Sequence, residues 1–234
     1  MKKTKKRGIE VLVFAKEKEV AEEVAGLITK EIRKKSGLRL GLATGKTMIP
    51  VYRELVKLYK KKKVNFSKVK IFSLDEYVGT NKMRNYLEKN FFSKVNVSRS
   101  NINLLDGKAR NLNLECKRYE KDIGRLDLQI LGIGRNGHIG FNEPGSGFRS
   151  NTRKIKLERA TLKDKGKFPE FALTIGIGTI LRANKILLVG FGKSKSETIS
   201  SALDKMSKKI PASALQRRKN VLFVLDKQAG KNLK

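Results

Sequence analysis

The single histidine of the chain, His138, has neighbours that suit acid–base chemistry. It follows an apolar run that is expected to form a buried strand, with Asn136 just before it and Glu143 just after it. A histidine ring held between an amide and a carboxylate can take up and release a proton near neutral pH. A lone histidine is also often structural, so the local sequence alone leaves both roles open.

Two adjacent carboxylates, Asp75 and Glu76, stand at the end of another predicted strand. Side chains alternate between the two faces of a strand, so only one of the pair needs to face a cleft. The other interpretation is a cap for a turn or for the helix that follows. The local sequence by itself favours the cap.

A turn containing Thr44, Gly45, Lys46 and Thr47 leads from a predicted strand into a predicted helix. Backbone N–H groups and the positive dipole end at a helix start attract anions, and these side chains add further donors. The turn resembles a P-loop but is one residue too short for that motif, which argues against nucleotide hydrolysis. It could also be only a connection between a strand and a helix.

The glycine pattern GIGRNG at residues 132–137 matches a dinucleotide-binding turn. That turn must open a helix in order to bind a dinucleotide. The residues that follow here, HIGFNEPG, contain two glycines and a proline and therefore argue against a helix. We do not expect a nicotinamide cofactor.

The elements that position these residues alternate between apolar runs and amphipathic stretches. This pattern predicts an α/β fold: a single-domain, modified doubly wound (Rossmann-like), mostly parallel sheet with helices on both faces. Strands are expected at residues 9–14, 38–42, 69–74, 126–133, 186–189 and 221–225, and helices at 20–34, from the 44–47 turn to 59, 85–94 and 113–123. Ligands of open α/β sheets bind beyond the carboxyl ends of the strands, so the chemistry is expected just after residues 42, 74, 133 and 189.

No composition break or linker divides the chain, so a single domain over residues 1–234 is expected. The basic residues 1–7 are interpreted as a mobile terminus. The lysine-rich residues 154–167 are interpreted as a mobile loop or lid.

The net charge of +32 could indicate a nucleic-acid or membrane partner. The basic residues are dispersed along the chain, however, and we recognise no nucleic-acid module. We therefore expect no nucleic-acid partner, and a surface that mildly steers anionic small molecules. No apolar run reaches membrane-spanning length, and the one cysteine, Cys116, fits a reducing compartment, so a cytoplasmic protein without a membrane partner is expected.

Five segments, in this order along the chain, resemble the signature segments of the glucosamine-6-phosphate deaminase family: DEYVG at 75–79, NINLLDG at 101–107, GIGRNGHIGFNEPGS at 132–146, ALTIGIGT at 172–179 and PASALQ at 211–216. The similarity extends from about residue 9 to residue 226. The related 6-phosphogluconolactonases share the fold and the glycine–histidine core but not the FNEP run.

This resemblance implies an enzyme that needs neither metal nor cofactor and converts glucosamine 6-phosphate into fructose 6-phosphate and ammonia. His138, positioned by Asn136 and Glu143, would open the sugar ring, and Asp75 would move a proton from C2 to C1. The phosphate would bind at residues 44–47 and at Lys195.

Three features depart from the family pattern or leave its assignment open. The spacing to Glu197 assigns the family's phosphate-binding lysine to Lys195 and not to Lys193. Many members have aspartate at the position of Asn136. Residues 154–167 are shortened, and the lid's usual phosphate-binding arginine is not identified there, so Arg159 or a nearby lysine is the candidate to replace it. The shortened segments predict an unregulated monomer or small homo-oligomer. The alternatives are a 6-phosphogluconolactonase and a basic nucleic-acid-binding protein on the same fold.

Overall fold

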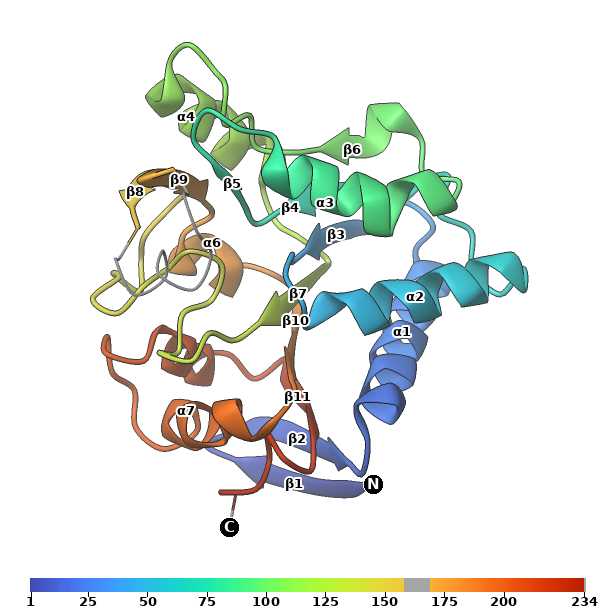
Figure 1. Cartoon of the computed structure of the whole chain (residues 1–234), viewed down its shortest axis with the longest axis vertical. Coiled ribbons are helices and arrows are strands. Elements are labelled where there is room, and N and C mark those ends of the chain that lie inside the picture. The colour runs from blue at the N-terminus through green and yellow to red at the C-terminus, as the bar shows by residue number, and fades with distance from the viewer. Residues whose placement is uncertain (158–168, 234) are drawn as a thin grey trace.

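The computed structural model describes residues 1–157 and 169–233 and is built around one eight-stranded sheet (Figure 1). The strand order is β1-β2-β11-β10-β7-β3-β4-β6, and every neighbouring pair is parallel except β1–β2. The strands are β1 (Lys2–Lys6), β2 (Ile9–Phe14), β3 (Arg39–Leu42), β4 (Lys70–Ser73), β6 (Ile102–Asn103), β7 (Leu128–Gly132), β10 (Lys185–Gly190) and β11 (Val221–Asp226).

Helices cover both faces of this sheet, with α1 and α2 on one side and α6 and α7 on the other (Figure 1). The amphipathic α1 buries Val20, Val24, Ile28 and Ile32, which follow one another at four-residue spacing and so share one face. The helices are α1 (Glu17–Lys34), α2 (Met48–Lys60), α3 (Lys82–Asn90), α4 (Leu112–Ile123), α6 (Ile177–Leu181) and α7 (Ser196–Ala202), with 3-10 turns η1 (Phe92–Lys94), η2 (Arg99–Asn101), η3 (Lys193–Lys195) and η4 (Pro211–Arg217). The predicted fold class is confirmed.

The order of the strands places a change of direction at the centre of the sheet. From β3 the chain adds β4 and β6 outward on one side, whereas from β7 it adds β10 and β11 on the other. Because β3 and β7 are hydrogen-bonded parallel neighbours, the order in which strands are added reverses between them. Such a reversal leaves a crevice at the carboxyl ends of the two strands, where open α/β sheets bind ligands.

A second, antiparallel sheet in the order β5-β9-β8 was not predicted from the sequence. Its strands are β5 (Asp75–Tyr77), β8 (Arg153–Lys156) and β9 (Phe171–Thr174). The first residues of the expected lid, 154–156, therefore belong to a strand and are not a loop, because β8 pairs along its length with β9. Leu157 is buried, and the remaining residues of that segment, 158–167, which include Arg159, lie outside the described residues.

The expectation of a mobile basic terminus is wrong for residues 2–6, which form the edge strand β1. These residues pair antiparallel with β2, and Lys3 forms an ion pair with Glu10 at 3.2 Å. Arg7 and Gly8 both have positive φ, as the two-residue turn of a tight hairpin requires. Backbone hydrogen bonds and this turn hold the strand without any apolar side chain.

Candidate active site

The four polar segments singled out in the sequence lie at the carboxyl ends of four adjacent strands. Residues 44–47 follow β3, Asp75 follows β4, His138 follows β7 and Lys195 follows β10. These strands are consecutive in the order β10-β7-β3-β4, and neighbouring strands are about 4.8 Å apart, so the segments lie along an edge of about 14 Å.

His138 belongs to a hydrogen-bonded chain of three side chains. The Oδ1 atom of Asn136 lies 2.8 Å from Nδ1 of His138, and Nδ2 of Asn136 donates to Oε2 of Glu143 at 2.7 Å. The carboxylate itself is 3.7 Å from Nδ1. Because an amide oxygen can only accept, a neutral ring carries its proton on Nδ1, and Nε2 is then the basic nitrogen.

The glycines of residues 132–137 shape the turn that carries His138 and make room for its ring. The N–H of Gly134 donates to the carbonyl of His138 at 2.9 Å, and a Cβ atom on Gly134 would lie 2.3 Å from the imidazole ring. Gly137 has a φ of +84°, which closes the turn between them. No helix follows, so the pattern is not a dinucleotide-binding turn.

The adjacent carboxylates Asp75 and Glu76 are both buried, but they have different surroundings. Glu76 accepts hydrogen bonds from the backbone N–H groups of Met83 and Arg84, both at 3.0 Å. Since these residues lie in the first turn of α3, Glu76 caps that helix, and the capping interpretation is confirmed for it. Asp75 points to the opposite face of β5.

Thr174 joins Asp75 to the loop that carries His138. Asp75 and Thr174 are opposite each other in the β5–β9 pair, and Oγ1 of Thr174 accepts from the N–H of Phe141 at 3.1 Å. A Cβ atom on Gly140 would lie 3.1 Å from Thr174 Oγ1 and 3.6 Å from Asp75 Oδ2. The histidine loop therefore passes directly beside the aspartate.

The other end of this loop is fixed by Arg153 of β8, which the sequence analysis did not identify. Its guanidinium donates to Oδ1 of the buried Asn142 at 2.9 Å and to Oγ of Ser146 at 3.2 Å. Burial lowers the pKa of Arg153. No local motif marks Arg153 or Thr174, because both act through partners that are distant in sequence.

The 44–47 turn is exposed at Gly45 and Lys46 and half-buried at Thr44 and Thr47. Gly45 has a φ of +103°, and its carbonyl accepts from the hydroxyl of Tyr86 at 2.7 Å. Burial raises the pKa of Tyr86 to about 12, so the phenol remains a donor. This contact holds the turn against α3 at the start of α2.

Lys195 and Lys193 differ in how far they are exposed. Lys193 is exposed, whereas Lys195 is half-buried beside the turn that carries Arg135. Burial lowers the pKa of Lys195, and the nearby positive charge of Arg135 lowers it further.

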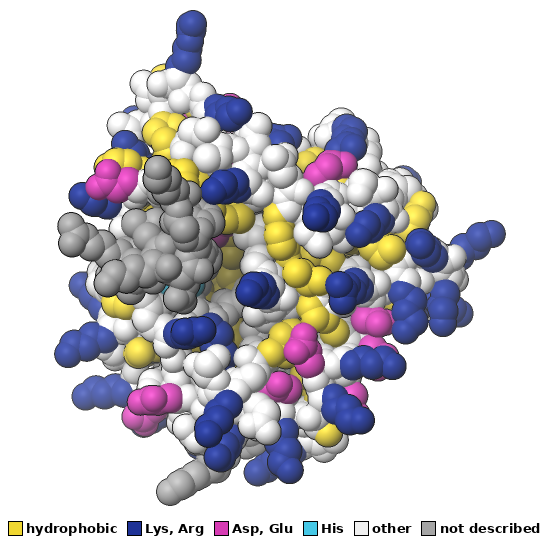
Figure 2. All heavy atoms as spheres, in the orientation of Figure 1, with side chains coloured by type: hydrophobic (Ala, Val, Ile, Leu, Met, Phe, Trp, Pro, Cys, Tyr) yellow, Lys and Arg dark blue, Asp and Glu magenta, His cyan; other side chains and the backbone are white. Residues whose placement is uncertain are grey.

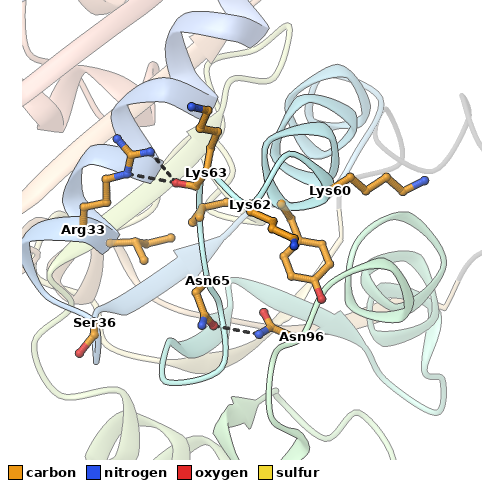
Figure 3. A pocket seen from close by; sticks show the side chains of 10 residues that line it. Arg33, Ser36, Lys60, Lys62, Lys63, Asn65 and Asn96 are labelled. Carbon is orange, nitrogen blue, oxygen red and sulfur yellow. Dashed lines mark hydrogen bonds between the residues drawn. The ribbon is translucent and has the colours of Figure 1, made fainter.

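A hollow of about 620 Å³ lies elsewhere, between the ends of α1 and α2 (Figure 3). Both helices end at the edge of the sheet opposite to His138, because each begins after the carboxyl end of a strand. The lining residues are Ile32, Arg33, Ser36, Tyr59, Lys60, Lys62, Lys63, Val64, Asn65 and Asn96. None of them is an Asp, Glu or His, so this hollow lacks groups for proton transfer near neutral pH, and the candidate active site is the one around His138.

Basic side chains are scattered over the face seen in Figure 2 and do not gather into one patch. Within residues 1–157 and 169–233, no helix is both long enough and apolar enough to cross a membrane. In the same part of the chain, no three or more His, Cys, Asp and Glu side chains form a group that could hold a metal ion.

Comparison with known sequences gives matches over nearly the whole chain. A family model described as glucosamine-6-phosphate isomerases/6-phosphogluconolactonase matches residues 15–224. A glucosamine-6-phosphate deaminase of Clostridium botulinum strain Langeland is 41% identical over 240 residues, covering 96% of this chain and 98% of the relative. A glucosamine-6-phosphate deaminase of Clostridium acetobutylicum is 41% identical over 231 residues, covering 92% and 96%.

Solved structures with the same fold include two enzymes from this group. A structure described as a monomeric glucosamine-6-phosphate deaminase has a TM-score of 0.91 at 35% identity, covering 94% of this chain and 98% of the relative. The 6-phosphogluconolactonase of Trypanosoma brucei has a TM-score of 0.75 at 18% identity, covering 96% and 98%. At that identity the second similarity shows the fold alone.

Proposed function

The chain belongs to the family of glucosamine-6-phosphate isomerases and 6-phosphogluconolactonases, and we infer that within it the protein is a glucosamine-6-phosphate deaminase. The reaction converts glucosamine 6-phosphate and water into fructose 6-phosphate and ammonia. The two clostridial deaminases, at 41% identity over more than nine-tenths of the chain, support this choice over the distant lactonases.

One structural observation carries the proposal. The chain Glu143–Asn136–His138 and the carboxylate of Asp75 lie side by side at the carboxyl edge of the sheet. Deamination of a cyclic amino sugar needs two proton transfers of different kinds, one between oxygens and one between carbons. The site offers one imidazole and one buried carboxylate for these two tasks.

His138 opens the sugar ring in this proposal. Its Nε2 takes the proton of the anomeric hydroxyl and returns a proton to the ring oxygen, so the C1–O5 bond breaks and C1 becomes an aldehyde. The amide oxygen of Asn136 accepts from Nδ1 of the ring, and its amide nitrogen donates to the carboxylate of Glu143. Asn136 therefore couples the negative charge of Glu143 to the ring through hydrogen bonds. The imidazolium that forms during transfer is thereby stabilised.

Asp75 then moves a proton along the carbon chain. It removes the proton from C2 while the aldehyde oxygen gains one, giving an enolamine. It then returns the proton to C1 while the amino nitrogen loses one, which balances the proton gained by the oxygen. The C2 imine that results takes up water, and ammonia leaves as the C2 carbonyl of fructose 6-phosphate forms. The carboxylate needs to act only as a base and then as an acid, so this step uses no redox group.

The phosphate binds at the turn of residues 44–47 and at Lys195 in this proposal. The turn opens the thirteen-residue helix α2, where backbone N–H groups and the dipole favour an anion. Lys195 adds a half-buried ammonium two strands away, after β10.

We also propose that the protein acts in the cytoplasm as a monomer or small homo-oligomer. The shortened segments of the chain and the similarity to a deaminase described as monomeric support the small assembly.

The activity itself is tested by ammonia release from glucosamine 6-phosphate. Purified protein should form ammonia and fructose 6-phosphate in equal amounts, with no added metal and in the presence of a chelator, because the proposed steps use only protein groups. Coupled enzymatic assays of both products measure this, with 6-phosphogluconolactone as the competing substrate. Loss of activity on chelation, or turnover of the lactone alone, would contradict the proposal.

The role of Asn136 can be tested by the pH dependence of that activity. Asn136→Asp should retain ammonia release and move the acid side of the profile of kcat/KM upward by about one pH unit, because a second anion stabilises the imidazolium. Ring opening starts from neutral imidazole, so a higher pH is then needed to reach half of the full rate. Glu143→Gln removes an anion and should move the same limb downward. Unchanged profiles for both variants would show that these side chains do not influence His138.

A further inference from the structure

We propose that Arg135 is a second cation for the phosphate of the substrate, acting together with Lys195 and making the site specific for phosphorylated sugars. This inference rests on the proposed function and adds to it a residue of the histidine turn. Arg135 would bind substrate directly, at the end remote from the proton transfers.

The order of the strands places Arg135 between the two segments already assigned to the phosphate. Residues 44–47 follow β3 and Lys195 follows β10, and β7 lies between these two strands and pairs with both. Arg135 comes three residues after β7 ends at Gly132. A phosphate bound to both flanking segments therefore lies next to the turn that carries Arg135.

A direct contact fixes this turn against the lysine segment. Thr198 lies in α7, three residues after Lys195, and its hydroxyl donates to the backbone carbonyl of Arg135 at 2.5 Å. The backbone of Arg135 is thus tied to the element that carries Lys195, while its side chain is exposed at the surface. Arg135 and Lys195 follow different strands, but they lie close to each other.

The charges of Arg135 and Lys195 indicate that this part of the site favours an anion. Two like charges side by side repel each other, and the pKa of Lys195 is lowered first by burial and then by the charge of Arg135. An anion that contacts both groups interacts favourably with each of these charges. A phosphate monoester carries close to two negative charges at neutral pH and has three acceptor oxygens, so it can engage an ammonium and a planar guanidinium together.

The test compares Arg135→Met with Arg110→Met. Methionine removes the charge and keeps most of the length of the side chain. Arg110 is another exposed arginine, between β6 and α4, and β6 is three strands away from β7 in the sheet. Inorganic phosphate is the probe for direct binding by calorimetry, and fructose 6-phosphate and fructose are compared in the same way.

Arg135→Met should weaken binding of inorganic phosphate and of fructose 6-phosphate about five- to twentyfold, and raise the KM for glucosamine 6-phosphate by a similar factor. The value of kcat should stay within about twofold, and the kcat/KM for unphosphorylated glucosamine should not change, because neither depends on the phosphate contact. Arg135→Lys should recover part of the affinity, and Arg110→Met should match the unmodified protein.

Equal phosphate binding by Arg135→Met and Arg110→Met would overturn the inference, and so would a fall in kcat at unchanged KM. The binding measurements separate this inference from the proposed function. If the unmodified protein released no ammonia, the deaminase proposal would fail, while a selective loss of phosphate binding in Arg135→Met would still support the role of Arg135.

Discussion

Asp75→Asn should abolish deamination, lowering kcat by about a thousandfold or more, because the amide cannot accept the proton of C2. The change is nearly isosteric, and Asp75 is buried beside Gly140 and opposite Thr174, so the site should keep its shape. The decisive measurement is exchange of the C2 proton of glucosamine 6-phosphate with deuterium from the solvent. Ammonia release and exchange should disappear together in this variant.

The neighbouring carboxylate supplies a matched control for this prediction. Glu76 is equally buried, but its oxygens accept from the backbone at the start of α3. Glu76→Gln should lower the free energy of unfolding by about 0.5–2 kcal/mol, as the loss of a helix cap does, and should retain proton exchange. Persistent exchange in Asp75→Asn, or its loss in Glu76→Gln alone, would show that the two carboxylates have been assigned the wrong way round.

The strands of the parallel core were predictable because each is an apolar run buried on both faces. β7, β10 and β11 show this pattern in the sequence, and the structure differs from the prediction by at most two residues at their ends. The amphipathic helices α1 and α4 were predictable for the corresponding reason, since their buried residues recur at helical spacing.

The edge strand β1 and the small sheet could not be found in this way. β1 has no apolar residue and is held by backbone hydrogen bonds to β2. The strands β5, β8 and β9 have only three or four residues each, and β5 pairs with β9 from a distant part of the chain. Short strands of this kind are set by tertiary pairing, which local pattern does not encode.

Part of the candidate active site could also be predicted from the sequence. The side chains of Asn136, His138 and Glu143 lie within eight residues, so their proximity followed from spacing, and the structure shows how they are bonded. The different roles of Asp75 and Glu76 depend on where α3 begins, which the sequence placed three residues too late. Their difference therefore became visible only in three dimensions.

His138→Gln should impair ring opening far more than the later proton transfer. Glutamine can form hydrogen bonds but cannot move a proton between the anomeric hydroxyl and the ring oxygen, so kcat on glucosamine 6-phosphate should fall by about a hundred- to ten-thousandfold. The residual rate should reflect the small open-chain fraction of the sugar in solution. C2 proton transfer by Asp75 should remain possible once that form binds.

The distinguishing substrate is a 5-O-methyl analogue of glucosamine 6-phosphate, which cannot close to the six-membered ring. On this analogue the His138→Gln variant should come within about tenfold of the unmodified protein, because the step that His138 performs is no longer needed. Asp75→Asn should stay inactive on both substrates, since the C2 proton must move in either case. An equal loss for His138→Gln on both substrates would mean that the imidazole also takes part in the carbon-to-carbon transfer, and the division of labour between His138 and Asp75 would be wrong. Selective rescue of the histidine variant alone would assign the ring proton to His138 and the carbon proton to Asp75.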